Sequence, residues 1–557
     1  MRLITLLLLL ASLLACAPRP ASSSDTLLFG GPIYTGEDAL PREALLIREG
    51  RVAFVGPLAE AEKRASQSVA RLDLKGAAAF PGFVDAHAHL RGVGERELTL
   101  NLEGAASIAD LQARVKAFAA AHPEDGLITG RGWIETHWPE ARFPTAADLD
   151  AAVPERPVLL VRADGHALAA NSKALALAGI TSRTPDPAGG AVLRGPDGTP
   201  TGMLIDNAMQ LTAKLRPAIS AQARRRALEA GLEVTASRGW VGMHNMSVPW
   251  EDVLALEALA AEAAPLRLRV YNAVTPEAWP NLLASGARTA GGDRVRTRAV
   301  KVYADGALGS RGAALFKPYA DANTTGLLLL DRKRATKIYA EAGKAGLQVA
   351  THAIGDQANA LVLDWYAETL GQTPRNARAI AEPRWRIEHA QVLQPGDLQR
   401  FQTLGVVASM QPSHAISDLY FAEARLGPER LAGAYAWRSL LNSGAIIAGG
   451  SDAPVERGDP LIEYYAAVVR KDLAGRSGPS WHPEQAVTRL QALHMFTTAP
   501  AYAAFEENER GTLSPGRFAD ISVFDVDLMR ADPGAILKGR ALLTLIEGEA
   551  AYRAPDW

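Results

Sequence analysis

Short apolar runs that resemble β-strands recur between helical stretches through most of the 557 residues. This alternation is typical of a parallel sheet, because each parallel strand needs a crossover, usually a helix, before the next. Eight such runs can be counted, at residues 79–85, 240–244, 266–274, 298–303, 347–352, 385–388, 406–410 and 445–450. Eight is the strand number of a (β/α)8 barrel, so the pattern predicts an α/β chain with a TIM-like barrel.

The gap between the first two runs is too long for a single crossover helix. It therefore predicts a lid or insertion at about residues 105–218, with a stretch rich in Pro and Gly at 185–202.

Both ends of the chain have a different texture, with short β-type pieces separated by turns. They lie at residues 27–29, 32–35, 44–48, 51–56 and 70–74, and again at 521–524 and 541–547, and Glu49-Gly50-Arg51 predicts a tight hairpin. We expect one β-sandwich built from residues 25–81 and 505–557, with the barrel at 82–504 inserted between them. Two unrelated β appendages are the alternative.

The N-terminus predicts export. An apolar run at residues 3–14 is too short to cross a membrane and fits a signal peptide of residues 1–15. Leu13-Leu14-Ala15-Cys16 resembles the bacterial lipobox, which implies lipidation of Cys16, a linker at 16–24 and a lipid-anchored protein of the cell envelope that faces the periplasm or the exterior. A plain secretory signal that contains a cysteine is the alternative. Ala17 after the cysteine resembles the pattern that is sorted to the outer membrane.

The composition limits the partners. A net charge of −2 and the lack of a basic stripe with aromatic residues give no reason to expect nucleic acid, and the membrane enters only through the lipid anchor. A small-molecule substrate is the expectation, and the oligomeric state is open, with a homodimer among the possibilities. The single cysteine excludes an internal disulfide and a thiolate metal cluster, which leaves imidazole and carboxylate as ligands.

Residues that bind metals or move protons gather where the predicted strands end. The first run ends in His87 and His89, whose spacing of two places both imidazoles on one side of a strand. The other members of this set are Lys301, His352, His389 and Asp452. Each alone has an ordinary reading, such as a structural histidine or a helix cap at Asp452. Together they predict a metal site, because active sites of such barrels lie at the carboxyl ends of the strands.

The order of these motifs resembles the amidohydrolase superfamily, and specifically its family 3 branch of N-substituted formamide deformylase-like enzymes. The resemblance covers nearly the whole mature chain and extends to further segments: Arg131-Gly132-Trp133, Asp164-Gly165-His166 through Asn171-Ser172, Asp305-Gly306 through Arg311, His352 to Asp356, Gln411-Pro412, and Gly511 to Asp520. Ala169-Ala170 departs from the pattern, where the branch often has a tryptophan, and this concerns the shape of the pocket.

The resemblance implies two metal ions. His87, His89 and Asp452 would hold the more buried ion, His352 and His389 the second, and Lys301 would bridge both as a carbamate formed with CO₂. A lysine kept neutral in an apolar strand is suited to that reaction, whereas an uncarboxylated Lys301 would be a buried charge that needs a partner. Nitrogen and oxygen ligands suit Zn²⁺, with manganese, iron and nickel as alternatives.

The implied reaction is hydrolysis of a carbon–nitrogen bond in an amide-like, non-peptide substrate. A hydroxide between the metals would attack the carbonyl, and Asp452 would act as general base and then acid. Residues implied to hold substrate are Trp133, His166, Asn171, Arg311, Asp356 and Gln411, and we expect His244 only to line the pocket. The remaining histidines are expected to be surface or structural residues: His122, His137, His414, His482 and His494.

Two other functional classes stay open. A mononuclear deaminase would use the same barrel with one metal, and Lys301 argues against it. A non-catalytic solute-binding lipoprotein would lack some ligands, and all the expected ligands are present. The sequence does not identify the substrate, because specificity depends on lid and loop shape.

Overall fold

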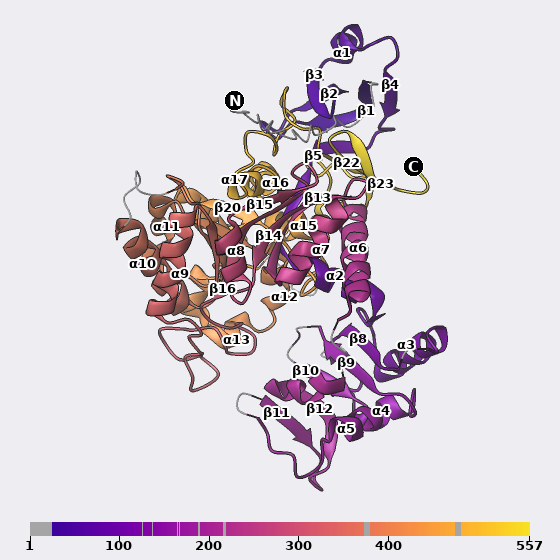
Figure 1. Cartoon of the computed structure of the whole chain (residues 1–557), viewed down its shortest axis with the longest axis vertical. Coiled ribbons are helices and arrows are strands. Elements are labelled where there is room, and N and C mark those ends of the chain that lie inside the picture. The colour runs from indigo at the N-terminus through magenta and orange to yellow at the C-terminus, as the bar shows by residue number, and fades with distance from the viewer. Residues whose placement is uncertain are drawn as a thin grey trace, which may run out of the picture.

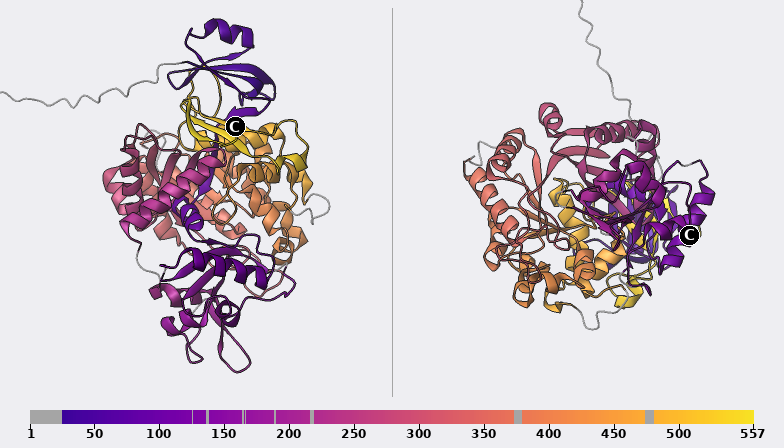
Figure 2. Two further views of the ribbon diagram at one scale, coloured as in Figure 1. Left: turned by 90° about the vertical axis from the view of Figure 1, so that its right-hand side faces the viewer. Right: turned by 90° about the horizontal axis from the view of Figure 1, so that it is seen from below.

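The computed structural model describes residues 25–124, 126–135, 138–163, 165, 167–187, 190–215, 219–372, 379–473 and 481–557. The predicted signal peptide, the lipobox with Cys16, the linker, His137 and His166 lie outside these residues. Within them, no helix is long and apolar enough to cross a bilayer. The described chain forms a central barrel with a β-sheet at one end and a smaller lobe at the other (Figures 1 and 2).

Eight parallel strands form the barrel, which confirms the predicted fold class. Each strand lies close to one of the predicted apolar runs, and the order around the barrel follows the order in the chain. The strands are β6 (Phe83–Ala88), β13 (Trp240–Val248), β14 (Arg269–Val274), β16 (Val295–Tyr303), β17 (Gln348–Ala353), β18 (Arg386–His389), β19 (Val407–Met410) and β20 (Ile446–Gly449).

Polar contacts join the first and last barrel strands at their carboxyl ends. The backbone N–H of Asp452 donates to the carbonyl of His87 at 2.6 Å. Asp85 accepts from both the backbone N–H and the hydroxyl of Ser451, at 2.9 and 2.5 Å. These bonds bring residues that are more than 360 positions apart to the same rim.

Helices pack around the barrel. Capping residues begin several of them, as where Ser220 accepts from the N–H of Ala223 and Asp331 from that of Arg334. The helices are α2 (Leu90–Leu98), α6 (Ala221–Ser237), α7 (Trp250–Ala260), α8 (Trp279–Ser285), α9 (Arg332–Ala345), α10 (Asp356–Gln372), α11 (Leu398–Leu404), α12 (Pro412–Asp418), α13 (Ala422–Leu426), α14 (Trp437–Asn442), α15 (Pro460–Val469), α16 (Arg489–Phe496) and α17 (Thr498–Ala503). Three 3₁₀ turns, η4 (Pro395–Asp397), η5 (Pro428–Gly433) and η6 (Pro483–Gln485), and the short strand β15 (Arg288–Ala290) complete this part.

The two ends of the chain meet in one hydrogen-bonded sheet. Its strands are β1 (Thr26–Tyr34), β2 (Pro41–Arg48), β3 (Arg51–Gly56), β4 (Ala70–Asp73), β5 (Ala78–Pro81), β21 (Ile521–Phe524), β22 (Ala541–Ile546) and β23 (Glu549–Arg553), with helices α1 (Leu58–Arg64) and α18 (Pro533–Ile536). The predicted hairpin turn has positive φ at Glu49 and Gly50, as a two-residue turn of type I′ requires.

The run at 79–85 differs from its prediction, because it divides into two strands. β5 pairs with β1 and β21 in the terminal sheet, whereas β6 enters the barrel. The division falls at Gly82, whose N–H donates to the carbonyl of Asp520 at 2.8 Å. Gly82 also has no room for a side chain, since a Cβ there would lie 2.4 Å from Val241 Cγ2.

The predicted insertion is a lobe with its own six-stranded sheet, in the order β11-β12-β10-β9-β8-β7. It contains β7 (Leu100–Asn101), β8 (Ile128–Trp133), β9 (Val158–Arg162), β10 (Ala167–Ala170), β11 (Gly190–Arg194), β12 (Pro200–Asp206), α3 (Ile108–Ala121), α4 (Ala146–Asp150), α5 (Ser172–Ala178) and η2 (Asn207–Leu215). The lobe lies at the end of the barrel opposite the terminal sheet, which is the end where the strands finish (Figure 1).

Candidate metal centre

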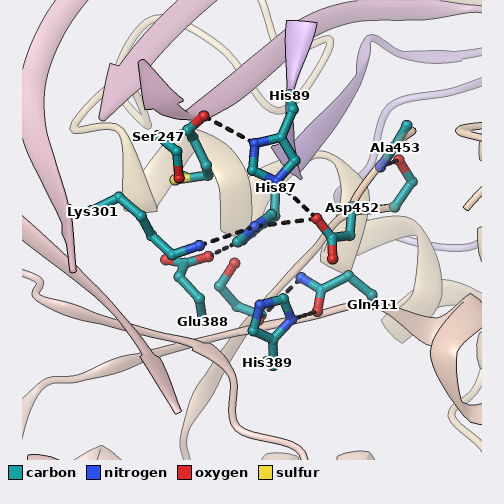
Figure 3. A network of polar contacts seen from close by, with 12 residues as sticks. His87, His89, Ser247, Lys301, Glu388, His389, Gln411, Asp452 and Ala453 are labelled. Atoms are coloured by element: carbon teal, nitrogen blue, oxygen red, sulfur yellow. Dashed lines mark hydrogen bonds and ion pairs between the residues drawn. The ribbon is translucent and has the colours of Figure 1, made fainter. Parts of the chain in front are cut away.

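His87 and His89 turn their imidazoles toward one point, as their spacing predicts (Figure 3). His87 is fully buried, and its Nδ1 lies 2.5 Å from Oε2 of Glu388. Nδ1 of His89 lies 3.0 Å from the carbonyl oxygen of Met246. Because a carboxylate and a carbonyl oxygen accept hydrogen bonds, both rings carry their proton on Nδ1 and leave the Nε2 lone pair for a ligand.

Asp452 faces these two nitrogens from the end of β20. Its Oδ1 lies 3.1 Å from Nε2 of His89 and 3.5 Å from Nε2 of His87. Burial raises the pKa of Asp452, but the surrounding histidines, His87 first, lower it more, so the pKa is well below its usual value. The side chain is therefore an anion at neutral pH and suits a cation.

His389 and His352 complete a cluster of four imidazoles. The ring of His389 lies 4.8 Å from that of His87 and 4.6 Å from that of His352, between centroids. Its Nδ1 lies 2.7 Å from Oε1 of Gln411. Burial is the largest cause that lowers the pKa of both rings, that of His352 to about 3, so both are neutral at neutral pH.

Lys301 lies in the same interior. Its side chain is 1% exposed, and its Nζ is 3.5 Å from Nε2 of His87 and 4.8 Å from the ring centroid of Tyr303. Among the described residues it forms no ion pair with a carboxylate. An ammonium buried without a carboxylate partner is costly.

These residues fit a metal ion. One ligand atom each from His87, His389 and Asp452 lies within 4.8 Å of the other two. The Nδ1 of three rings is held by a carboxylate, a carbonyl or an amide oxygen, an arrangement that fixes the tautomer of metal-binding histidines. Nitrogen and carboxylate donors without a thiolate are suited to Zn²⁺ and similar divalent metals. The tight group contains one histidine from each of the two predicted ligand sets.

A buried ion pair next to His87, Arg386 with Glu388, was not predicted from the sequence. Arg386, also fully buried, donates to both oxygens of Glu388 at 2.7 and 3.1 Å, to the carbonyl of Ala86 at 2.6 Å and to the hydroxyl of Ser409 at 2.7 Å. Burial raises the pKa of Glu388, but Arg386, His87 and Lys301 together lower it more, so the pKa is below its usual value and the carboxylate stays ionised. Arg386 and Glu388 are two apart in a short strand that ends in His389, so their side chains lie on the same side of it, and this spacing was the available signal.

His244, predicted to line the pocket, lies instead in the barrel interior behind the cluster. It is 2% exposed, and its Nδ1 is 2.7 Å from a guanidinium nitrogen of Arg386. It therefore supports the Arg386–Glu388 pair, and through that pair His87.

Asp305 is a second buried carboxylate that sequence reasoning did not single out. It accepts from the backbone N–H groups of Ala314, Ile354 and Gly355, and its Oδ1 lies 3.6 Å from Nε2 of His352. This places the loop after β16 against the end of β17, where His352 projects.

The residues predicted to hold substrate divide into two groups. Gln411 lies in the cluster through His389. Trp133 and Asn171 do not reach it: Trp133 is buried in the lobe core with its indole N–H on the carbonyl of Leu160, and the buried side chain of Asn171 caps α5. The polar groups of both side chains form hydrogen bonds within the lobe, so these two residues support the lobe and do not face the cluster.

Arg311 and Asp356 are also engaged elsewhere. Arg311 pairs with Asp321 at 2.9 Å near the surface. Asp356, in the first turn of α10, accepts from the N–H of Phe316 at 3.0 Å and from Gln394. Both hold the long loop that follows β16, and the structure does not bring them to the cluster.

His414 corrects the prediction that it is a surface or structural residue. It stacks on His389 with 5.7 Å between centroids, and its Nε2 lies 3.6 Å from Oδ2 of Asp452. That nitrogen is buried and has no hydrogen-bond partner in the described part of the chain. His414 follows the end of β19 by several residues, so it lies outside the pattern of strand-end residues from which the site was predicted. The other described histidines outside the cluster, His122, His482 and His494, contact Phe118, Glu484 and Gly36 respectively.

Comparisons with known proteins agree with this site. The profile of the amidohydrolase family matches residues 71–552. A putative amidohydrolase of Bacillus subtilis (strain 168), YtcJ, is 34% identical over 534 residues, which cover 94% of this chain and 98% of that protein. N-substituted formamide deformylase of Arthrobacter pascens is 28% identical over 531 residues, 92% of this chain and 95% of that protein.

A solved structure agrees as well. An uncharacterized metal-dependent hydrolase from Pyrococcus horikoshii OT3 superposes with a TM-score of 0.75 at 30% identity, covering 92% of this chain and 99% of that one. With the cluster at the strand ends and the family match over most of the sequence, the chain belongs to the amidohydrolase family and is a metal-dependent hydrolase of that family.

Proposed function

We propose that this hydrolase cleaves a carbon–nitrogen bond of an amide-like, non-peptide small molecule. The observation that carries the proposal is the convergence of four imidazoles, Asp452 and a buried lysine at one rim of the barrel. The name of the Arthrobacter pascens relative, an N-substituted formamide deformylase, supports an amide substrate.

The residues would hold two divalent metals, with zinc the expected ion. His87, His89 and Asp452 would bind one, His352 and His389 the other, and Lys301 would serve both as a carbamate. The lack of an ion pair on Lys301 among the described residues supports the modification. When bound, the metals would supply a Lewis acid that polarises the scissile carbonyl and makes water acidic enough to react at neutral pH.

Asp452 would move the proton of the reaction. As an anion beside His89 and His414, it can accept a proton from the attacking water and return it to the nitrogen that leaves. The carbon–nitrogen bond breaks, the water oxygen remains on the carbonyl carbon, and the amine departs with the transferred proton. His414, whose Nε2 is 3.6 Å from Oδ2 of Asp452, is placed to contact the substrate at the same point.

The test is a substrate screen with metal-loaded protein. N-acyl amines, formamides, cyclic amides and lactones would be offered to the wild type and to Asp452→Asn. We expect turnover of at least one amide class and a loss of about 10²–10⁴-fold in kcat/KM in the variant, as for removal of a general acid–base group. Hydrolysis of lactones only, or full activity of Asp452→Asn, would contradict the proposal.

A mononuclear deaminase is the second candidate, since the tight group of His87, His389 and Asp452 is sufficient for one metal. It predicts ammonia release from an aminated heterocycle and one metal per chain. A solute-binding protein predicts no turnover of any class.

We further propose that the enzyme is anchored through a lipid on Cys16 to the bacterial cell envelope. The support is the lipobox-like sequence that precedes the described residues. A lipidated cysteine carries enough acyl chain to hold a soluble domain at a membrane. The variant Cys16→Ser should leave the membrane fraction or remain unprocessed, and unchanged fractionation would refute the proposal.

A further inference from the structure

A cavity of about 480 Å³ lies between the lobe and the barrel. The lobe contributes residues 104–106 with Ile134 and Trp138. The barrel side contributes residues of α12, the loop after β20, and Tyr420, Ile462, Asp472 and Leu473. Two of these barrel segments also reach the centre, since α12 carries His414 and the loop after β20 contains both Asp452 and Glu456. The walls of the cavity therefore include chain neighbours of His414 and Asp452, and Glu456 is close enough to Asp452 for their charges to interact.

The walls of the cavity are largely apolar. Ile134, Tyr420 and Leu473 are 40%, 52% and 39% exposed and lie on the same cavity, and a group of exposed apolar side chains favours a ligand-binding surface. Trp138 donates its indole N–H to the carbonyl of Ala105 at 2.6 Å, so it offers the cavity only carbon atoms. Ile416 of α12 faces them from the barrel side. Apolar walls of this kind bind the hydrocarbon part of a ligand.

One carboxylate on these walls has spare acceptor capacity. Glu456 accepts a single hydrogen bond, from the hydroxyl of Ser417 at 2.6 Å, among the described residues. The nearest cation in sequence, Arg457, is paired with Glu103, and the other wall carboxylate, Asp472, accepts from the hydroxyl of Tyr420. Burial raises the pKa of Glu456 to about 7, so a cation bound beside it would favour its charged form.

Resting on the proposed function, we infer that this cavity selects amides whose apolar body ends in a protonated amine, and that Glu456 is the residue that recognises the amine. The apolar walls would hold the body while the amide lies at Asp452 and His414. Ser417 would orient the carboxylate toward the incoming ammonium. Glu456 determines specificity and takes no part in bond cleavage.

The test uses two probes of similar shape, N-(4-aminomethylbenzyl)formamide and the neutral N-(4-ethylbenzyl)formamide, with metal-loaded full-length protein. We expect the wild type to prefer the aminomethyl probe in kcat/KM by about tenfold or more, as for a hydrogen bond to a charged group. In Glu456→Gln the two probes should be hydrolysed with about equal kcat/KM, mainly because kcat/KM for the aminomethyl probe falls. Glu429→Gln, which changes an exposed glutamate outside the cavity, is the matched control and should retain the preference.

A binding measurement separates this inference from the proposed function. Calorimetry with the corresponding amines, 1,4-bis(aminomethyl)benzene and 4-ethylbenzylamine, needs no turnover. Tighter binding of the diamine by the wild type, lost in Glu456→Gln, supports the inference even if no amide is hydrolysed. Equal binding of both amines by the wild type, or a preference that Glu456→Gln retains, would overturn it. Hydrolysis without preference would overturn only the inference and leave the proposed function intact.

Discussion

The two ends of the barrel both carry buried charged groups, and they differ in how these groups are paired. At the end that packs on the terminal sheet, Arg269 donates to both oxygens of Asp520, at 2.7 and 3.1 Å, and to Glu547 at 2.7 Å. Arg294 also contacts Glu547, at 3.2 Å. At the opposite end, Asp452 has no guanidinium partner among the described residues. Its Oδ1 faces Nε2 of His89 and of His87 at 3.1 and 3.5 Å, and Nζ of Lys301 lies 3.5 Å from Nε2 of His87.

The difference shows what each end is built for. Carboxylates matched by guanidinium groups are satisfied, and here they attach the terminal sheet to the barrel. Imidazole lone pairs and a carboxylate that converge without a guanidinium partner are costly unless a cation fills the space. This agrees with the general division of such barrels into a stabilising end and a reactive end. The division predicts that substitutions at the two ends affect different measurements.

The largest effect is expected for Lys301→Ala, at the reactive end. Without the bridging group, we expect the metal content to fall from two ions per chain to one or fewer and kcat/KM to fall by at least about 100-fold. Metal content would be measured by mass spectrometry of the purified protein. Propionate or bicarbonate should partly restore the alanine variant. Lys301→Arg should remain inactive with either addition, because a guanidinium stays protonated. One metal with undiminished activity in Lys301→Ala would favour the deaminase alternative.

At the stabilising end, Asp520→Ala should lower the free energy of unfolding by about 3–5 kcal/mol, because it leaves Arg269 buried with one partner fewer. The molecules that remain folded should keep kcat/KM within about threefold, since the change is at the far end of the barrel. Denaturant unfolding and steady-state kinetics would be measured on the same preparation. Asp556→Ala breaks the exposed pair with Arg540 and should leave the unfolding midpoint unchanged. A loss of activity in Asp520→Ala without a loss of stability would contradict the division into a stabilising end and a reactive end.

Glu388→Gln sharpens the comparison, because Glu388 is paired with Arg386 but also contacts Nδ1 of His87 at the reactive end. The amide keeps the shape but weakens the hold on Nδ1 of His87, and we expect metal affinity to fall about 10–100-fold. Competition with a chelator of known affinity would measure it. Glu463→Gln is the matched control, since burial raises the pKa of Glu463 well above its usual value and an uncharged group already stands there. Equal metal affinity in both variants would show that Glu388 has no role in positioning His87.

The smallest expected effect is a loss of stability at acidic pH. Burial raises the pKa of Asp520, but Arg269 lowers it more, so its folded-state pKa is below the unfolded value of about 4. The stability that this carboxylate contributes is therefore present above about pH 4 and is lost as the pH falls through the folded-state pKa. The difference in unfolding midpoint between the wild type and Asp520→Asn should be constant from pH 6 to pH 5 and shrink toward pH 3. A difference that grows on acidification would show that the pair does not hold Asp520 ionised.

The sequence by itself determined the local elements and which way their side chains face. Apolar runs gave the eight barrel strands, since a strand buried on both faces is a continuous apolar segment. Glu49 and Gly50 gave the hairpin, because such a turn needs positive φ at both residues. The spacing of two between His87 and His89 gave a shared direction, because side chains on a strand repeat every two residues. All of these properties depend on neighbours in the chain.

Tertiary structure alone decided which distant residues meet. The division of the run at 79–85 depends on β21, more than 430 residues later, and the hydrogen bond at Nδ1 of His87 depends on Glu388 of another strand. His414 reaches Asp452 only because α12 lies over the rim, and Trp133 points into the lobe because its sheet closes around it. The physical reason is that register and strand order bring such groups together. No local pattern of apolar and polar residues records that order.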